Sequence, residues 1–238
     1  MRFEPIASSS HGNAYLVEDA GCRLLLEAGI PFRRLQRALD YRVQELAACL
    51  ITHEHKDHAG HVAKVLECGV PVYASPGTAR ALGLEGLTPF PLPAGGNLGP
   101  PFAVGTLTVV PFRVFHDAAE PVGYLLRGSD GEQLAFATDT GGLAYKFPGV
   151  QILALEANYD DELLSRCTRL PDTVKQRVRA THMEIGRLCA YLEGLDLSAC
   201  RELWLLHLSD ASSHEGRFVD LVERAVGSGV HVRAAPRG

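Results

Sequence analysis

Three histidines and one aspartate fall within six residues of one short segment, and their types and spacing could bind metal ions. In the sequence Thr52-His53-Glu54-His55-Lys56-Asp57-His58, alternate residues of an extended chain face the same side, so the imidazoles of His53 and His55 could hold one divalent cation. Asp57 and His58 would face a second position nearby, where a carboxylate beside a histidine suits Zn²⁺ and also accepts Mn²⁺ or Fe²⁺. The segment predicts a two-metal site, and the alternative is a solvated, histidine-rich turn that starts a helix.

The elements around this segment must hold it in place. Residues 46–51 are an apolar run typical of a buried strand, and residues 59–68 have helical spacing. The four candidate ligands therefore lie on a strand-to-helix loop, where a rigid scaffold can direct side chains without burying unpaired polar groups. Residues 70–74 predict the next buried strand, which would close a β-α-β unit.

This pattern resembles the H-x-H-x-D-H signature of the metallo-β-lactamase superfamily. The resemblance implies an α/β fold, the four-layer αβ/βα sandwich, with a dinuclear site at one end of two packed sheets. It does not choose the reaction, because members of the superfamily cleave lactams, thioesters, glyoxal adducts and phosphodiesters.

Three later residues complete the ligand set that the resemblance implies. Residues 111–118 and 120–124 closely resemble the segment that carries the third metal-binding histidine, here His116, in the WalJ/YycJ-like branch, which is related to PhnP and RNase Z. Asp139 follows an expected strand in a Thr-Asp-Thr-Gly context similar to that of the bridging aspartate, and an Asx turn is its alternative. His207 lies in a Leu-x-His-Leu-Ser context, although the asparagines usual after it are missing.

The resemblance assigns these residues to two cations, Zn²⁺ or Mn²⁺. The first cation would take His53, His55 and His116; the second would take Asp57, His58 and His207; Asp139 would lie between them. Asp57 is also a candidate for proton transfer. His182 matches the histidine of a Gly-His-Leu-Ser motif of the branch and is a candidate general acid, although Thr181, Met183 and Glu184 differ from that motif.

Two segments are candidates for substrate contact. Residues 8–13, Ser-Ser-Ser-His-Gly-Asn, are similar to a Ser-x-Gly-Asn turn of many superfamily phosphodiesterases, and their backbone amides could approach an anion; an ordinary hairpin turn is an equal alternative. We expect Ser10 and Asn13 to contact substrate. We expect the same of Asn158 and Tyr159, where Tyr159 replaces the branch's usual histidine but keeps a hydroxyl that can hydrogen-bond a phosphate.

Length and composition favour one domain, residues 1–238, because no linker or repeat divides the chain; residues 88–101 are expected as a long loop. The net charge of −5 gives no case for indiscriminate nucleic-acid binding, although residues 166–187 are rich in arginine. No apolar run approaches ~18 residues and the six cysteines lack metal-site spacing, so we expect reduced thiols and a cytoplasmic protein without a membrane segment. A homodimer is suggested by analogy alone.

The rest of the chain alternates between strand and helix patterns. The expected strands are residues 3–7, 14–17, 24–27, 107–115, 134–138, 152–155, 203–206 and 230–233, and the expected helices are residues 31–39, 173–192, interrupted at 181–183, and 215–226.

We interpret the chain as a dinuclear metal-dependent hydrolase, an enzyme that uses a metal-bridging hydroxide on phosphodiesters, and by resemblance a 5′-to-3′ DNA exonuclease. The alternatives are a phosphodiesterase for a small cyclic phosphate such as a phosphoribosyl cyclic phosphate, a thioester or lactam hydrolase, and a metal-stabilised binding module.

Overall fold

The computed structural model describes residues 1–92 and 98–238. It is a mixed α/β chain with two β-sheets, which confirms the predicted α/β class. The chain folds into two compact units, one formed by Met1–Arg113, Ala118–Gln133 and Pro236–Gly238 and the other by Val114–Asp117 and Leu134–Ala235. The single domain stays a prediction. Among the described residues, no helix combines the length and the apolar character that crossing a membrane requires.

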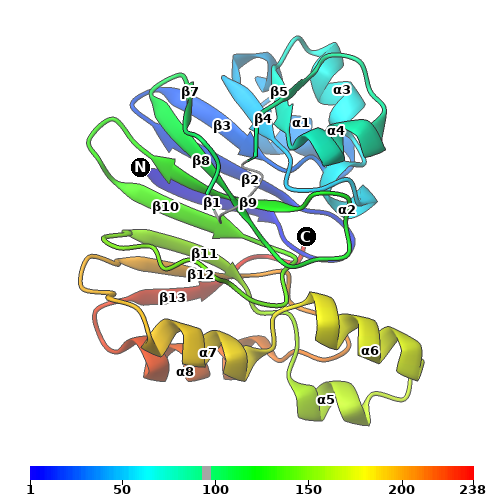
Figure 1. The fold of residues 1–238 in the computed structure, drawn as a ribbon, viewed down its shortest axis with the longest axis vertical. Coiled ribbons are helices and arrows are strands. Elements are labelled where there is room, and N and C mark those ends of the chain that lie inside the picture. The colour runs from blue at the N-terminus through cyan, green and yellow to red at the C-terminus, as the bar shows by residue number, and fades with distance from the viewer. Residues whose placement is uncertain (93–97) are drawn as a thin grey trace. The chain divides into compact units, whose positions relative to one another are not determined.

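The first unit contains a six-stranded sheet with strands in chain order (Figure 1). Its three antiparallel strands agree with the expected ones, and the strands after β3 pair in parallel, as a β-α-β unit requires. Leu24 to Leu26 and the strand that follows them along the sheet are fully buried. The strands are β1 (Arg2–Ala7), β2 (Ala14–Asp19), β3 (Cys22–Leu26), β4 (Ala48–Leu50), β5 (Val72–Ala74) and β6 (Leu87–Pro89).

Short helices cover this sheet and supply apolar residues to its core. Leu35, Val62 and Val65 are buried against residues such as Leu25 and Ile51. These helices are α1 (Phe32–Ala38), the 3₁₀ turn η1 (Val43–Glu45), α2 (Lys56–Ala59), α3 (Val62–Glu67) and α4 (Pro76–Leu82). The helix expected at residues 59–68 is present as α3 but begins later, because the His61 N–H donates to the Ala28 carbonyl (2.9 Å) and separates α3 from α2.

Three antiparallel strands complete the first unit, namely β7 (Phe102–Val104), β8 (Leu107–Arg113) and β9 (Val122–Arg127). The expected strand at residues 107–115 is too long by two residues, because the backbone of Phe115 bonds to the segment after Asp139 and not to a neighbouring strand. The sequence interpretation missed β9. Of the loop expected at residues 88–101, residues 93–97 lie outside the described residues, and its first two residues end β6.

The second unit has four parallel strands. The first three are mainly apolar, as strands covered on both faces are, whereas the last, His-Val-Arg-Ala, has an exposed histidine and an exposed arginine. Phe136, Ala154 and Trp204 are neighbours across β10 (Gln133–Ala137), β11 (Ile152–Glu156) and β12 (Glu202–Leu206), and β13 (His231–Ala234) pairs with β12.

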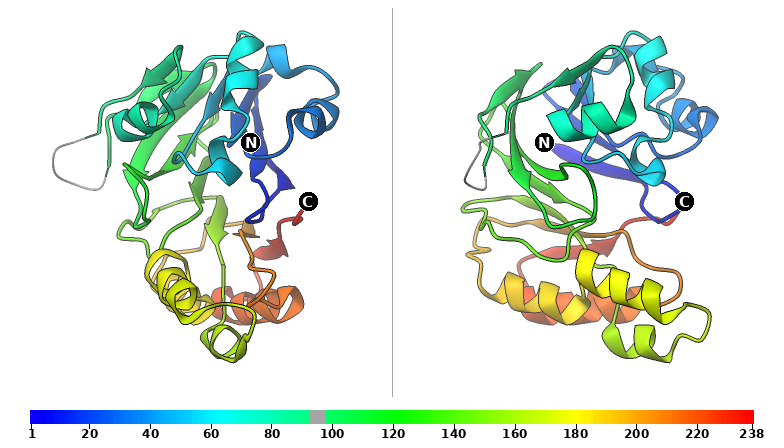
Figure 2. Two further views of the ribbon diagram at one scale, coloured as in Figure 1. Left: turned by 90° about the vertical axis from the view of Figure 1, so that its right-hand side faces the viewer. Right: turned by 45° about the vertical axis from the view of Figure 1, so that its right-hand side comes forward.

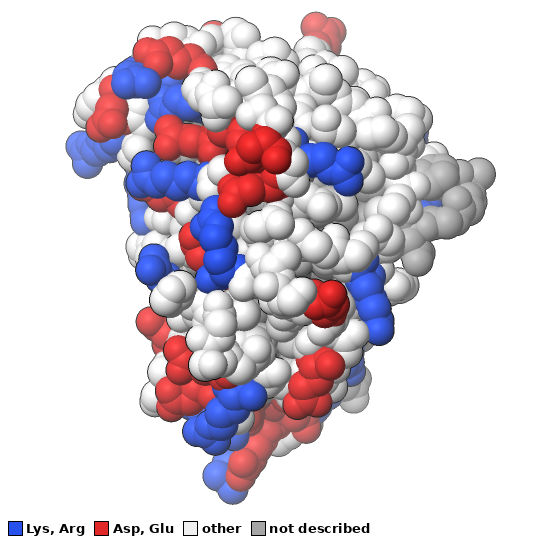
Figure 3. Space-filling view, turned by 90° about the vertical axis from the view of Figure 1, so that its left-hand side faces the viewer, with Lys and Arg blue, Asp and Glu red and all other residues white. Residues whose placement is uncertain are grey.

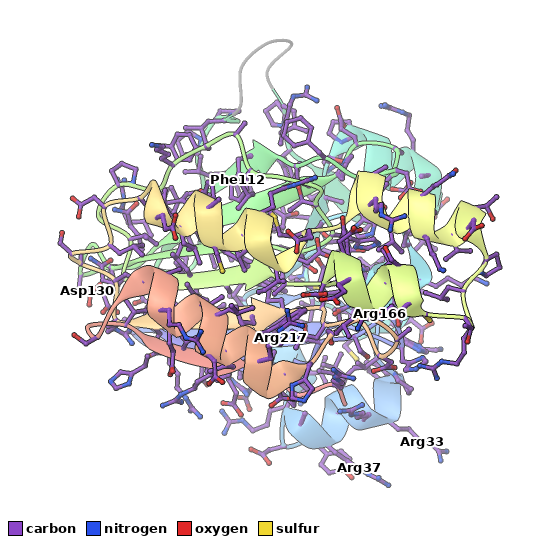
Figure 4. The ribbon with its side chains drawn as sticks, turned by 90° about the horizontal axis from the view of Figure 1, so that it is seen from below. Arg33, Arg37, Phe112, Asp130, Arg166 and Arg217 are labelled. Carbon is purple, nitrogen blue, oxygen red and sulfur yellow. The ribbon has the colours of Figure 1, made fainter. Side chains whose placement is uncertain are left out.

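Four helices belong to this unit: α5 (Asp161–Arg166), α6 (Asp172–Thr181), α7 (Ile185–Glu193) and α8 (Glu215–Val226). Helices α7 and α8 lie side by side (Figure 2). Arg217 of α8, labelled in Figure 4, pairs with Asp160, the N-cap of α5, at 3.0 Å. The interruption expected between residues 181 and 183 separates α6 from α7, so the chain turns at His182.

Candidate metal centre

In the first unit, the loop that follows β4 and the short helix α2 together carry four of the predicted ligands, and their backbone is held from two sides. The expectation that all four lie on the loop is wrong for the last two, which lie in α2. The Asn13 N–H donates to the Asp57 carbonyl (2.8 Å), and the Ala28 N–H donates to the His58 carbonyl (2.7 Å). Gly29 packs so closely that a Cβ atom there would lie 1.7 Å from the Asp57 carbonyl oxygen. The two turns at residues 8–13 and 27–30 therefore fix the loop's path.

The donor atoms of this loop form two close pairs. His53 Nε2 lies 3.1 Å from His55 Nδ1, and His58 Nε2 lies 3.3 Å from an Asp57 carboxylate oxygen. Two ligand atoms on one tetrahedral Zn²⁺, each ~2.0–2.1 Å from it, are separated by roughly 3.3 Å. Both pairs therefore have the spacing that a shared cation requires, and they are the pairs predicted from the alternation of residues.

Two buried residues hold the ring of His58. Glu27 Oε1 lies 3.6 Å from Nδ1, and the side-chain nitrogen of Asn13 lies 3.1 Å from Nε2. The Glu27 carboxylate also accepts the Thr52 N–H, and its burial raises its pKa against the opposing effect of His58. Glu27 is the residue that follows β3, and its backbone is in the left-handed region with φ 65°. The carboxylate is thus placed to orient His58.

In the second unit, Asp139 lies between two of the predicted histidine ligands. One carboxylate oxygen is 3.4 Å from His116 Nε2 and the other is 3.5 Å from His207 Nε2. Each oxygen therefore faces a different imidazole at about the spacing of two ligands on one cation. This is the arrangement expected of an aspartate that bridges two ions.

The backbone of this unit is bent at both strand ends that carry ligands. Asp139 has φ 48° and His207 has φ 55°, both in the left-handed region that residues other than glycine rarely adopt. Each such residue costs about 1–3 kcal/mol and persists only where the surroundings enforce it. The Thr140 N–H donates to Glu156 Oε2 (2.7 Å), and Arg187 donates to the Gly141 carbonyl, so the turn is held from two directions.

The second ring nitrogens of these histidines contact the protein. His116 Nδ1 lies 2.9 Å from the Thr181 carbonyl, which leaves Nε2 directed at Asp139. Burial lowers the pKa of His116, with Asp139 opposing it, and this favours the neutral ring that binds cations. The side-chain nitrogen of Asn158 lies 3.0 Å from His207 Nδ1 and donates to the His207 carbonyl (2.8 Å). Asn158 therefore orients His207; substrate contact stays a prediction for it.

His182, at the end of α6, lies beside both histidines. Its ring stacks parallel to His207 with centroids 5.6 Å apart, and its centroid is 5.1 Å from that of His116. Nδ1 lies 2.6 Å from Glu156 Oε1. Burial lowers the pKa of His182, but the charge and hydrogen bond of Glu156 outweigh it and raise this pKa to about 9.

Glu156 itself is engaged with the protein. Its second oxygen accepts the N–H groups of Thr140 (2.7 Å) and Met183 (3.1 Å). Asp139, Glu156, His182 and His207 have donor atoms within 4.8 Å of one another. The three hydrogen bonds to Glu156 indicate that it positions His182 and the turn after Asp139.

The turn at residues 8–13 uses its amides internally. The N–H groups of Ser9, His11 and Gly12 donate to acceptors within the turn, and the N–H of Asn13 donates to the Asp57 carbonyl. The Asn13 side chain also contacts Asp57 and His58. These four backbone amides are already paired, which favours an ordinary turn over an anion-binding turn. Ser10 is exposed and Tyr159 is buried, and substrate contact stays a prediction for both, as it does for Asn13.

The basic segment is largely paired with acidic groups. Arg166 pairs with Glu162, Arg177 with Asp117, and Arg179 with Asp161. These ion pairs favour a solvated helix face for α6. On another face of the molecule, shown in Figure 3, charges of both signs likewise lie beside one another.

Sequence reasoning missed Glu27 and Glu156 as functional groups. Each is a fully buried carboxylate at the end of an apolar strand, and a charged residue is rarely fully buried unless it has partners. A glutamate at the end of an apolar run, as in Leu-Leu-Leu-Glu and Ala-Leu-Glu, was the sequence feature that could have indicated these two residues.

Comparison with known proteins agrees with this geometry. The family model described as a β-lactamase superfamily domain matches residues 22–208. The chain belongs to this superfamily. It is 30% identical over 225 residues to "Exodeoxyribonuclease YycJ" of Bacillus anthracis, covering 88% of this chain and 83% of that protein. It is 29% identical over 189 residues to "Exodeoxyribonuclease WalJ" of Streptococcus pneumoniae serotype 2, covering 75% of this chain and 70% of that protein.

A solved structure supports the fold of this superfamily member. The metallo-β-lactamase fold protein YhfI of Bacillus subtilis is 16% identical and superposes with a TM-score of 0.71 over 99% of this chain and 97% of YhfI. The implied metallo-β-lactamase fold and the resemblance to the WalJ/YycJ-like branch are confirmed, and the superfamily member is a metal-dependent hydrolase.

Proposed function

We propose that this superfamily member is a dinuclear phosphodiesterase that acts on DNA as an exonuclease. The observation that carries the proposal is Asp139, whose two oxygens face Nε2 of His116 and Nε2 of His207. A carboxylate in that position serves two cations, and a pair of cations is suited to phosphodiester cleavage. The exodeoxyribonuclease names of YycJ and WalJ support DNA as the substrate.

The proposed donor assignment uses the seven ligands expected from the sequence. His53, His55 and His116 would hold one cation, Asp57, His58 and His207 would hold the other, and Asp139 would serve both. The spacing of the donor pairs within each unit supports this assignment. When bound, two divalent cations, Zn²⁺ or Mn²⁺, supply charge neutralisation at the phosphate and an ionised water for attack on phosphorus.

Protein groups then serve orientation and proton transfer. Glu27 and Asn158 orient His58 and His207. His182, held by Glu156, supplies a proton to the leaving oxygen, because a positioned acid near that oxygen assists departure of an alkoxide. Asp57 would assist proton transfer in addition to its role as a ligand.

The donor chemistry also separates this proposal from the other hydrolases of the superfamily. Among the described residues, the groups that could hold a cation contain histidine and carboxylate but no cysteine. Hard oxygen and imidazole ligands suit Zn²⁺ and Mn²⁺ at a phosphate site. A thioester or lactam substrate has no comparable support.

Protein reloaded with Mn²⁺ or Zn²⁺ and given a 5′-phosphorylated, end-labelled DNA duplex provides the test. We expect stepwise shortening that disappears in His116→Ala and Asp139→Ala and persists in His231→Ala, a matched change at an exposed histidine of β13. Intact DNA with metal bound would refute the nuclease, and turnover of a cyclic phosphodiester in that case would move the assignment to a small-molecule phosphodiesterase.

A further inference from the structure

An exposed aromatic ring stands directly beside a candidate metal ligand. Phe115 is 56% exposed although it follows an apolar strand, and it precedes His116 in the chain. Together with His116, Asp117, Ala180 and Thr181 it lines a hollow of about 310 Å³ in the second unit. Single exposed apolar residues are ordinary on protein surfaces, so the case depends on how this ring is held and on what surrounds it.

The backbone of Phe115 is fixed by the segment that carries Asp139. Its N–H donates to Thr140 Oγ1 (3.1 Å), and its carbonyl accepts the Gly141 N–H (2.9 Å). Gly141 in turn packs against α6, because a Cβ atom there would lie 2.7 Å from the Ala180 carbonyl oxygen. The ring therefore projects from a rigid backbone that is shared with the bridging ligand, which is what a preorganised stacking surface requires.

The charge in the hollow does not oppose a polyanion. Asp117 is the only acidic residue that lines it, and its carboxylate binds Arg177 through two hydrogen bonds, one of them 3.0 Å long. The positive guanidinium of Arg177 therefore offsets the negative carboxylate of Asp117. An apolar face next to a neutralised ion pair suits a planar base attached to a phosphate.

We propose that Phe115 is a stacking platform for the nucleobase of the nucleotide whose phosphodiester lies at the metal ligands. This inference rests on the proposed function and deepens it. It assigns the enzyme to nucleosidic phosphodiesters, because stacking on an aromatic ring tolerates every base but requires one. A base-free phosphodiester with the same leaving group gains nothing from the ring.

Two esters with one leaving group test the assignment: thymidine 5′-(p-nitrophenyl) phosphate, which carries a base, and methyl p-nitrophenyl phosphate, which does not. The measured quantity is the ratio of their kcat/KM values with metal-loaded protein. We expect Phe115→Ala to lower this ratio by ~5- to 100-fold, the range of one base stacked on an aromatic side chain. Phe115→Leu should lower it as well, whereas Phe115→Trp should retain it.

Val174→Ala is the matched control, because Val174 is an exposed apolar residue of α6 outside the hollow. The ratio of kcat/KM values for the two esters should be the same in Val174→Ala as in the wild type. An unchanged ratio in Phe115→Ala would overturn the assignment while leaving the phosphodiesterase intact. If the wild type cleaves neither ester, the proposed function is still decided by the DNA duplex, and the stacking role of Phe115 is tested by binding. A labelled 5′-phosphorylated strand should bind Phe115→Ala more weakly than the wild type, and its counterpart with an abasic terminal nucleotide should show no such difference; equal affinities for the first strand would refute the platform.

Discussion

At the scale of single residues, the candidate centre depends on carboxylates that point at imidazoles. Asp139 faces two rings, Glu27 faces His58, and Glu156 faces His182. Each carboxylate follows or ends a buried strand, so its partners are chosen by the fold and not by sequence neighbours. A buried charge of this kind is tolerated only where it is paired, so each of these carboxylates needs its histidine partner.

Replacing Glu27 by Gln tests the orienting role of such a carboxylate. The amide keeps the shape of the side chain and can still accept the Thr52 N–H, but it removes the negative charge 3.6 Å from His58 Nδ1. Groups that orient a metal-binding histidine typically change metal affinity by about 10- to 100-fold. We therefore expect the weaker of the two Zn²⁺ affinities, measured by titration against a chelator, to fall by about that factor.

Glu67→Gln is the control for this measurement, since Glu67 is an exposed residue that pairs with Lys64. Its Zn²⁺ affinities should match those of the wild type. Unaltered affinities in a folded Glu27→Gln protein would mean that Glu27 only supports the loop.

At the scale of elements, the segment of residues 53–58 is held in place by the turns at residues 8–13 and 27–30, and Gly29→Ala should disturb it. A Cβ atom at position 29 would lie 1.7 Å from the Asp57 carbonyl oxygen, a contact that only backbone movement can relieve. Overpacking of this kind costs typically about 1–3 kcal/mol. We expect urea unfolding of the metal-free protein to show a loss of that order, together with weaker binding of Zn²⁺.

Gly229→Ala serves as the comparison, because no atom lies within 4 Å of a Cβ atom built there. Its free energy of unfolding should stay within about 0.5 kcal/mol of the wild type, as for surface substitutions. Equal stabilities of the two variants would show that the loop at residues 57–58 yields without cost.

Some element boundaries were predictable from sequence patterns and others were not. The strand and helix around His53 to His58 were predictable because apolar period and ligand spacing are local properties. The break between α2 and α3 was not, since it depends on a hydrogen bond from His61 to Ala28, a residue of a distant turn. The early end of β8 has the same origin in Thr140 and Gly141.

The candidate site divides in the same way. His53, His55, Asp57 and His58 were predictable from their types and spacing, and His116, Asp139 and His207 required the family resemblance because each stands alone at the end of a strand. Neither residue spacing nor the family resemblance predicted the roles of Glu27, Glu156 and Phe115, because these roles depend on which strand ends lie together.

At the scale of the whole molecule, removal of metal tests the proposed centre. A cation at 100 times its dissociation constant adds about 2.7 kcal/mol to the free energy of unfolding. For a chain of 238 residues this corresponds to a rise in Tm of about 5–10 °C, which a chelator should reverse.

If the proposed ligands serve the same cations, substitution of any one of them should remove much of that rise. We expect His53→Ala and His116→Ala each to lower both the bound metal per chain and the rise in Tm on adding Zn²⁺, whereas His231→Ala should behave as the wild type. Two independent centres would give a different pattern, because His116→Ala would then leave the contribution of His53 and His55 intact. Metal content and thermal melting of the same samples separate the two cases, since a single centre loses metal from all its ligands when either histidine is replaced.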